Sequence, residues 1–164
     1  MVELLSKLET YRIFNYLYPG TLFLFACSWL DVFELKDQNL LINAFLAYFC
    51  GMTISRVGSI MIEKPLKIIG FIKHCPYEDY VQAEKKDDKI KILLEEANAY
   101  RTLIATALAV MLIGLAKYLV TASFIQTPTI LVLAFIAVIV LYLFAYKKQV
   151  GFVTRRVNAN NKTN

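Results

Sequence analysis

Four long apolar blocks dominate the pattern of hydrophobic and polar positions along the chain. They cover residues 13–30, 40–59, 102–120 and 129–146. A helix needs about 20 mostly apolar residues to cross the ~30 Å hydrocarbon core, since unpaired backbone groups cannot be left in lipid. The pattern therefore predicts an all-α membrane protein with four transmembrane helices.

The polar segments between these blocks predict how the helices are connected. Residues 31–39 and 121–128 are short links, so the first two spans form one hairpin and the last two form another. A polar stretch, 63–101, separates the hairpins, and within it residues 65–73 mix bulky apolar side chains with lysines. Such a mixture is typical of a segment that lies in the membrane interface.

The rest of this polar stretch predicts a cytoplasmic helical hairpin that runs into the third span. Pro76 is favoured at the first position of a helix, and the acidic residues that follow it complement the positive helix start. This helix should end near Lys86, and Asp87 or Asp88 can cap the next one. The second helix continues into the third span without a break, which predicts about 33 residues and about 50 Å of helix.

These elements divide the chain into four segments. Residues 1–62 hold an N-terminal interfacial helix and spans one and two, and residues 63–101 form the cytoplasmic hairpin. Residues 102–146 hold spans three and four, and residues 147–164 form a basic cytoplasmic tail. One compact membrane domain is expected, because the apolar residues are concentrated in blocks and not spread at the period of a soluble core.

Composition and charge support a membrane protein and predict its orientation. Hydrophobic side chains make up 58% of the 164 residues, above the roughly 45–50% of soluble domains. Of the 18 Lys and Arg residues, only Lys36 and Lys117 lie at the two short links. Cytoplasmic flanks collect basic residues, so both termini and the central stretch are expected in the cytoplasm.

The second span has one helix face that is nearly free of bulky side chains. Small residues recur there every four positions: Ala47, Gly51, Ser55 and Ser59. The third span offers a matching narrow face with Ala105 and Ala109. Small residues let helix backbones approach closely, which favours helix association in lipid. Two interpretations remain open, because this face either packs against other spans of the same chain or forms an interface between subunits.

Three polar residues within the apolar blocks are candidate functional residues. Arg56 lies about one turn from the cytoplasmic end of the second span, where a long side chain can reach the headgroups. It either snorkels or pairs internally, or it contacts an anion in a headgroup pocket or lines the mouth of a pore. Asn15 and Asn43 are expected to form hydrogen bonds between helices, with a pore or ligand site as the alternative.

Charges outside the spans indicate two kinds of partner. The tail carries cations that suit anionic lipid headgroups, although orientation alone also explains them: Lys147, Lys148, Arg155 and Arg156. The stretch 63–101 holds eight acidic and eight basic residues. Such mixed charge suits a surface for neighbouring subunits or a soluble protein, whereas a nucleic-acid footprint would be one-signed. A solvated connector is the other interpretation.

The chain has no pattern that specifies a reaction. Its one histidine, His74, is followed directly by Cys75, and adjacent side chains point in different directions, so they do not form a catalytic pair. There is no His-Glu-x-x-His, no Cys-x-x-Cys and no glycine-rich phosphate loop. We expect no catalytic activity, no cofactor and no metal.

Several short runs resemble a group of small four-span bacterial membrane proteins, and the resemblance covers about a third of the chain. The runs are Ile54-Ser55-Arg56-Val57-Gly58-Ser59-Ile60, Pro76-Tyr77-Glu78-Asp79-Tyr80, Lys85-Lys86-Asp87-Asp88-Lys89-Ile90 and Ala99-Tyr100-Arg101-Thr102. Such proteins are often encoded in mobile or phage-defence loci, as the membrane component of Kiwa-type systems or as accessory proteins of RNA-targeting CRISPR loci. The resemblance implies an oligomeric sensor or effector in the bacterial inner membrane that works with a cytoplasmic partner.

The leading functional hypothesis is a non-enzymatic membrane protein that self-associates through spans two and three and engages a partner through residues 63–101. One alternative is a small channel or pore formed between subunits. Another is a structural protein that binds a different membrane protein. No nucleic-acid partner is expected.

Overall fold

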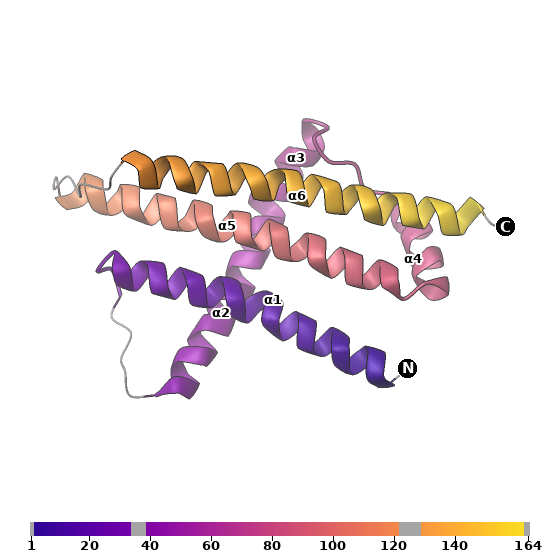
Figure 1. Ribbon diagram of the computed structural model, residues 1–164, viewed down its shortest axis with the longest axis horizontal. Helices are drawn as coiled ribbons and strands as arrows, with labels where there is room; N and C mark the ends of the chain where they lie inside the picture. Colours follow the sequence, from indigo (N-terminus) through magenta and orange to yellow (C-terminus); the bar gives the residue numbers. More distant parts are fainter. Residues whose placement is uncertain (1, 34–38, 122–128, 163–164) are drawn as a thin grey trace.

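The computed structural model describes the backbone of residues 2–33, 39–121 and 129–162, and the side chains of 13–33, 39–120 and 132–161. All regular structure in this part of the chain is helical, which confirms the predicted all-α class (Figure 1). The elements are α1 Val2–Trp29, α2 Leu40–Gly58, the π-helix η1 Ser59–Glu63, α3 Lys64–Ile68, α4 Tyr77–Lys86, α5 Lys89–Thr121 and α6 Thr129–Lys162. Lys36, residues 122–128 and the side chains of the expected interfacial helix lie outside the described residues.

Three helical stretches in the described part of the chain are long and apolar enough to cross a membrane. They are Leu40–Ile68, Lys89–Val120 and Val132–Asn161. The first of them joins α2, η1 and α3 into one continuous helical stretch. The start of the predicted polar stretch 63–101 therefore continues the helix of the second predicted span. α1 is not among the three stretches, and the count of four spans therefore stays a prediction.

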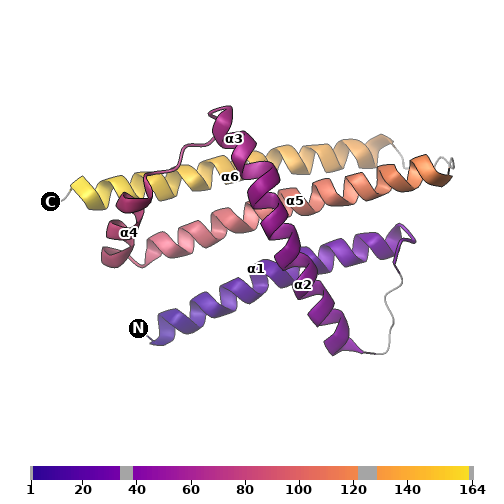
Figure 2. The same cartoon turned by 180° about the vertical axis from the view of Figure 1, so that it is seen from behind.

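α5 forms the centre of the molecule, and α6 folds back beside it. α5 has 33 residues and begins at Lys89, two positions after Asp87, as the cap and the apolar pattern predict. Asp87 accepts a hydrogen bond from the backbone N–H of Lys89 at 3.2 Å, which satisfies one of the free donors at the helix start. α5 and α6 lie side by side and antiparallel in both views (Figures 1 and 2).

α2 crosses α1 and α5 steeply and does not pair with α1 as a hairpin (Figures 1 and 2). A Cβ atom on Gly20 of α1 would overlap the carbonyl oxygen of Ala47, and one on Gly51 of α2 would overlap the carbonyl oxygen of Tyr16. Backbones that touch at small residues cross at that point, whereas larger side chains hold the helices apart elsewhere. The expected hairpin of spans one and two is therefore wrong.

Two expected segments are continuous with their neighbours. α1 is a single helix, not an interfacial helix followed by a separate span, because no helix-breaking residue precedes Pro19. The expected basic tail is also helical, since α6 continues to Lys162. The buried apolar residues in this half of α6 follow a helical spacing: Tyr146, Val150, Val153 and Val157.

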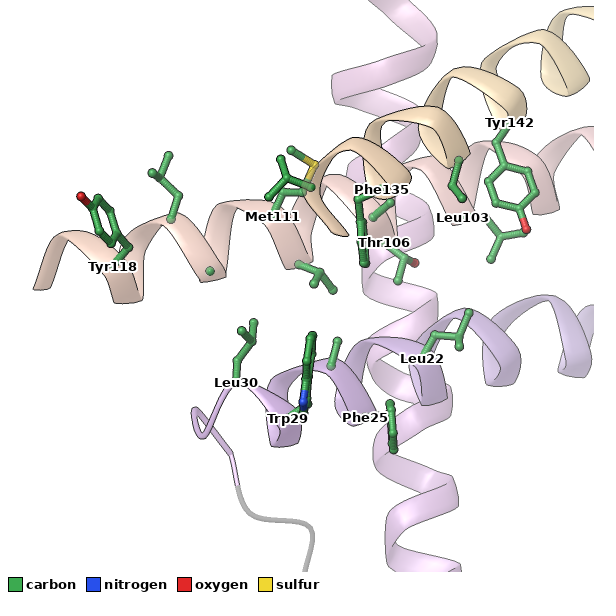
Figure 3. A pocket seen from close by; sticks show the side chains of 17 residues that line it. Leu22, Phe25, Trp29, Leu30, Leu103, Thr106, Met111, Tyr118, Phe135 and Tyr142 are labelled. Carbon is green, nitrogen blue, oxygen red and sulfur yellow. The ribbon is translucent and has the colours of Figure 1, made fainter. Parts of the chain in front are cut away.

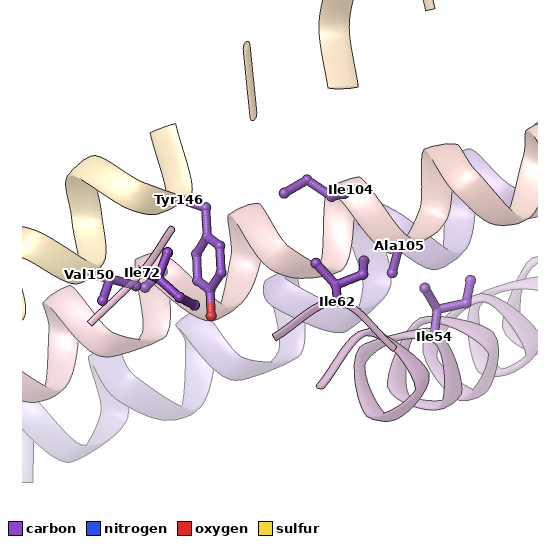
Figure 4. Close-up of a cluster of buried hydrophobic side chains, with 8 residues drawn as sticks. Ile54, Ile62, Ile72, Ile104, Ala105, Tyr146 and Val150 are labelled. Atoms are coloured by element: carbon purple, nitrogen blue, oxygen red, sulfur yellow. The ribbon is translucent and has the colours of Figure 1, made fainter. Parts of the chain in front are cut away.

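The buried side chains form two hydrophobic cores along α5 and α6. The first lies where α2 crosses α5 and contains Ile54, Ile62, Ile72, Ala97, Ile104, Ala105, Tyr146 and Val150 (Figure 4). The second lies under α4 and contains Ala83, Ile90, Val153 and Val157. This second core joins α4, residues 89–97 of α5 and residues 149–161 of α6 into a unit that we call the terminal module.

Candidate functional site

The π-helix that continues α2 ends in a carboxylate that contacts α5. η1 lies directly between α2 and α3. A π-helix shifts the side chains that follow it relative to an α-helix, and it is frequent at functional sites. Glu63, the last residue of η1, has a side chain that is only 15% exposed. The π-helix therefore places a charged group inside the molecule.

Glu63 is the centre of a cluster of charged and polar side chains. The guanidinium of Arg101 on α5 donates a hydrogen bond to its carboxylate. The Nζ atom of Lys67 lies 2.7 Å from this carboxylate, and the Nε2 atom of His74 lies 3.8 Å from it. Tyr146 of α6 is fully buried and its hydroxyl interacts with Arg101. We call these five residues the junction cluster, because they join η1, α3, α5, α6 and the loop before α4.

The junction cluster holds an ion pair where little water reaches it. Arg101 is 9% exposed. Two charges that leave water lose hydration worth several kcal/mol each, so they are stable only when they are well paired. Removal of Glu63 would leave Arg101 as an uncompensated buried charge, whereas removal of Arg101 would leave Glu63 paired with Lys67 alone. The pair therefore holds η1 against α5 in one position.

The surroundings of His74 in this cluster favour its neutral form. Burial lowers the pKa of His74 below its ordinary value of 6.5, and the Lys67 ammonium lowers it further, while the Glu63 carboxylate opposes the shift and Arg101 adds to it. Among the described residues, the Nδ1 atom of His74 and the Nε atom of Arg101 are buried without a hydrogen-bond partner. Proton uptake by His74 would add a positive charge beside two others, so acid acts against this arrangement.

Other polar contacts tie α5 to α1 and α2 beside the junction cluster. Asn15 of α1 donates a hydrogen bond to the carbonyl of Glu95 at 3.3 Å. The hydroxyl oxygens of Ser55 on α2 and Thr102 on α5 lie 3.2 Å apart, and both residues are buried. α5 is thus the helix to which the others are attached through polar groups.

The small-residue face predicted on the second span is covered within the chain. Four of the predicted residues are buried: Ala47, Gly51, Ser55 and Ala105. The other two, Ser59 and Ala109, are half-buried. α1 covers this face at Tyr16, and a Cβ atom on Gly58 would lie 3.0 Å from that of Ala105. These contacts correspond to packing between helices of one chain, which is one of the two interpretations that the sequence leaves open.

The polar residues predicted within the spans have different surroundings. Arg56 is exposed on the last turn of α2, a position that suits a side chain reaching for headgroups. Asn15 contacts α5 as described above, and Asn43 is half-buried at the start of α2. The buried arginine is Arg101, so the charge inside the fold is not the one that the apolar pattern singles out.

Three of the four cations predicted to contact lipid lie over aromatic rings. The Nζ atom of Lys147 is 4.4 Å from the ring centre of Phe71. Lys148 and Arg155 both lie over Phe152, at 5.7 Å and 4.9 Å from its ring centre. Cation–π contacts of this kind hold a charge at the surface without neutralising it, so these side chains still present positive charge outward.

The fourth cation, Arg156, forms an ion pair inside the terminal module. Its guanidinium donates to the carboxylate of Asp87, and Asn160 donates to the same carboxylate at 3.3 Å. The hydrogen bond from Arg156 is the main cause that holds the pKa of Asp87 below its ordinary value of 3.8. Arg156 therefore ties the end of α6 to the start of α5.

An apolar groove of about 870 Å³ runs between α1, α5 and α6 (Figure 3). Trp29 and Leu30 line one end of it, and Leu103 and Tyr142 line the other. The hydroxyl of Thr106, in its wall, already binds the carbonyl of Thr102 at 3.0 Å. The described residues that line the groove provide no converging polar side chains of the kind that a conducting path through one subunit would need.

The junction cluster is the part of the site that sequence reasoning missed. The hydrophobic pattern assigns Glu63 and Arg101 to the two ends of the polar stretch and gives no reason to pair them. The available signal is their opposite charge beside the ends of spans two and three, which the predicted topology brings to the same membrane surface.

No protein-family model matches this chain, and no curated protein or solved structure matches it either. Among the residues that the structure describes, no three His, Cys, Asp or Glu side chains form a group that could hold a metal ion. A function therefore has to follow from the junction cluster, the terminal module and the exposed surfaces.

Proposed function

We propose that this protein is a four-span, non-enzymatic protein of the bacterial inner membrane, with both termini in the cytoplasm, that works as an oligomeric sensor or effector with a cytoplasmic partner. Contacts along α5 support an even number of crossings. Lys117 donates to the carbonyl of Leu30, so α1 and α5 end at the same level. Arg156 near the end of α6 pairs with Asp87 just before α5, so α6 ends close to where α5 begins. The two termini accordingly lie at one end of the molecule (Figure 1).

The observation that carries the proposal is the continuity of α5 and α6 between the two cores. Both helices run without a break from the crossing with α2 to the terminal module. The 33 residues of α5 correspond to about 50 Å of helix, whereas the hydrocarbon core is about 30 Å thick. A change in packing within the bilayer would therefore reach the terminal module through two rigid helices.

The partner surface that we propose is the outer face of α4. Tyr77 is 79% exposed there, and Glu78, Gln82 and Lys85 are exposed on the same helix, whereas Ala83 is fully buried against the second core. Mixed charges beside an exposed aromatic ring suit contact with another protein. A role in phage defence rests on the sequence resemblance alone.

Self-association is tested by the number of chains in the particle and not by substitutions on the small-residue face of α2. Gly51 and Ser55 lie inside the chain, so leucine at either position would damage the fold whether or not the protein self-associates. The number of subunits can be measured by mass photometry of particles extracted together with their native lipids. A particle that contains one chain would contradict the oligomeric part of the proposal.

A photo-crosslinking amino acid at Gln82 tests the partner surface in living cells. We expect it to capture one defined protein. The same probe at Leu133, which is 60% exposed on the apolar part of α6, should not capture that protein. The adduct should also disappear when Asp87→Ala loosens the terminal module. Identical adducts from both probe positions, or adducts that survive Asp87→Ala, would contradict a partner on α4.

A further inference from the structure

The turn after α3 exposes two large apolar side chains next to each other. Ile68, the last residue of α3, is 84% exposed, and Ile69 is 71% exposed. The chain reverses at Gly70, whose φ of +70° is in the left-handed region that glycine adopts without strain. α3 projects from the side of the α5–α6 pair in both views (Figures 1 and 2). We call residues 64–73 the α3 tip.

The α3 tip is surrounded by positive charge. Lys64, Lys67 and Lys73 belong to it, and all three are exposed. Lys147 of α6 is exposed beside it, with its Nζ atom over the ring of Phe71. Four cations therefore border the two exposed isoleucines.

The acidic residue next to the tip pairs with only one of these four cations. Glu63 is turned inward, where its carboxylate binds Arg101 and also Lys67. Lys67 is thus held by the junction cluster. The charges of Lys64, Lys73 and Lys147 remain at the surface, so the tip is a one-signed surface, in contrast to the mixed outer face of α4.

Aromatic and apolar contacts hold the tip at the end of the predicted fourth span. Phe71 packs edge-on against Phe144, with ring centres 6.1 Å apart. Ile72 is 3% exposed and lies in the first core together with Tyr146. Because residue 146 ends that span, the tip lies at the level where acyl chains meet headgroups in the proposed topology. Bulky apolar side chains flanked by lysines are favoured at this level.

We propose that the α3 tip binds anionic phospholipids of the bilayer that holds the protein. Ile68 and Ile69 enter the acyl layer, and Lys64, Lys73 and Lys147 bind the headgroup phosphates. Charge complementarity selects lipid as the occupant, since the cytoplasmic leaflet is negative and attracts clustered lysines. The inference rests on the proposed function in one respect, because it needs the tip beside the headgroups.

Tryptophan quenching by lipids brominated in the upper acyl chain tests this site. Trp29 is the one tryptophan of the chain, so a Trp29→Phe, Ile69→Trp variant reports on the tip. In nanodiscs that contain phosphatidylglycerol we expect strong quenching at position 69, and much less in discs of phosphatidylcholine alone. A Trp29→Phe, Tyr77→Trp variant on α4 is the matched control and should not be quenched. Solvent-like emission without quenching at position 69 in the anionic discs would overturn the proposal.

The unaltered chain separates a failure of this site from a failure of the membrane placement. Trp29 lies in the predicted first span, so its quenching reports insertion of the helices themselves. Quenching of Trp29 but not of position 69 would overturn the lipid site alone. No quenching at either position would overturn the membrane placement and the lipid site together.

Removal of the cations provides a second test with a different readout. In a Lys64→Gln, Lys73→Gln variant, the amount of phosphatidylglycerol retained by the purified protein should fall by about fivefold per lysine removed, as counted by native mass spectrometry. A Lys85→Gln, Lys86→Gln variant removes the same charge from α4 and should retain lipid as the wild type does. Equal losses in both variants would show a general charge effect and overturn the assignment to the tip.

Discussion

Gly51 decides how closely α2 approaches α1. In Gly51→Ala the new methyl group would overlap the carbonyl oxygen of Tyr16, so the two backbones must separate. We expect a loss of about 1–3 kcal/mol in unfolding free energy, the usual cost of overpacking, seen as a lower melting temperature in detergent. Gly151→Ala is the control, because no atom beyond its own stretch of helix lies within 4 Å of the added group. An unchanged melting temperature for Gly51→Ala would mean that the helices do not touch there.

His74 makes the stability of the junction cluster depend on pH. Its pKa is below 6.5 in the folded protein, so the unfolded chain binds the proton more readily. Stability is therefore complete above about pH 6.5 and falls as the pH drops through the folded pKa. The wild type should melt at a lower temperature at about pH 5 than at about pH 7.5, and His74→Gln should reduce this difference. The same pH dependence in both proteins would assign it to other groups.

The sequence pattern identifies which residues of α2 are buried but not what buries them. The spacing of Gly51 and Ser55 predicts a contact face, and α1 and α5 of the same chain cover it. The pattern favours Arg56 as the important charge because it lies inside an apolar block. The buried charge is Arg101, which is paired with Glu63. Helical periodicity relates residues within one helix and carries no information about the pairing of Glu63 with Arg101.

The bounds of helices are predictable where caps or apolar stripes mark them. α5 begins after Asp87 and has the predicted length. The stripe of Val150, Val153 and Val157 is present in the sequence, although the positive charge of the same segment favours the interpretation as a tail. The crossing of α2 over α1 is not predictable in this way, because length and hydropathy say that a helix can span a membrane but not at what angle it meets its neighbour.

Asp87 holds the start of α5 to the end of α6. Its carboxylate accepts hydrogen bonds from the Lys89 N–H, Arg156 and Asn160. Asp87→Ala removes a helix cap worth about 1 kcal/mol and leaves Arg156 without its ion-pair partner, so hydrogen exchange should become faster in α4 and at the end of α6. Asp88→Ala, at the exposed neighbouring position, should leave exchange unchanged. An equal increase in exchange at the α1–α2 crossing would show a loss of overall stability and would contradict a local role for Asp87 in the terminal module.

The surface chemistry changes along α5 and α6 near the junction cluster. Large apolar side chains point outward on one side of it: Leu112 is 66% exposed and Phe144 is 59% exposed. An outward face of this kind has lipid as its natural solvent. On the other side, the terminal module exposes charged residues such as Glu78 and Lys85. The junction cluster therefore lies where a membrane surface is expected, and its buried ion pair couples the two regions.

Labelling of single cysteines tests the proposed crossings. The native thiols are first replaced by serine at Cys27, Cys50 and Cys75. Val32→Cys, which is exposed just after α1, should react with an impermeant maleimide in intact cells, since the first link is expected outside. Lys85→Cys on α4 should react only after the membrane is permeabilised. Reaction of Lys85→Cys in intact cells would reverse the proposed orientation.

Contacts between α4 and the end of α6 allow a sharper labelling test, because they fix on which side of the membrane the two segments lie. Arg156 of α6 binds Asp87, and Asn161 donates to the carbonyl of Asp79 at 3.1 Å, so α4 and the end of α6 must lie on one side of any bilayer. Asn158→Cys, exposed on α6, should therefore be labelled under the same conditions as Lys85→Cys. Labelling of the two positions from opposite sides would require an odd number of crossings by α5 and α6. The contacts of Arg156 with Asp87 and of Asn161 with Asp79 could then not form in the membrane, and this result would contradict the terminal module.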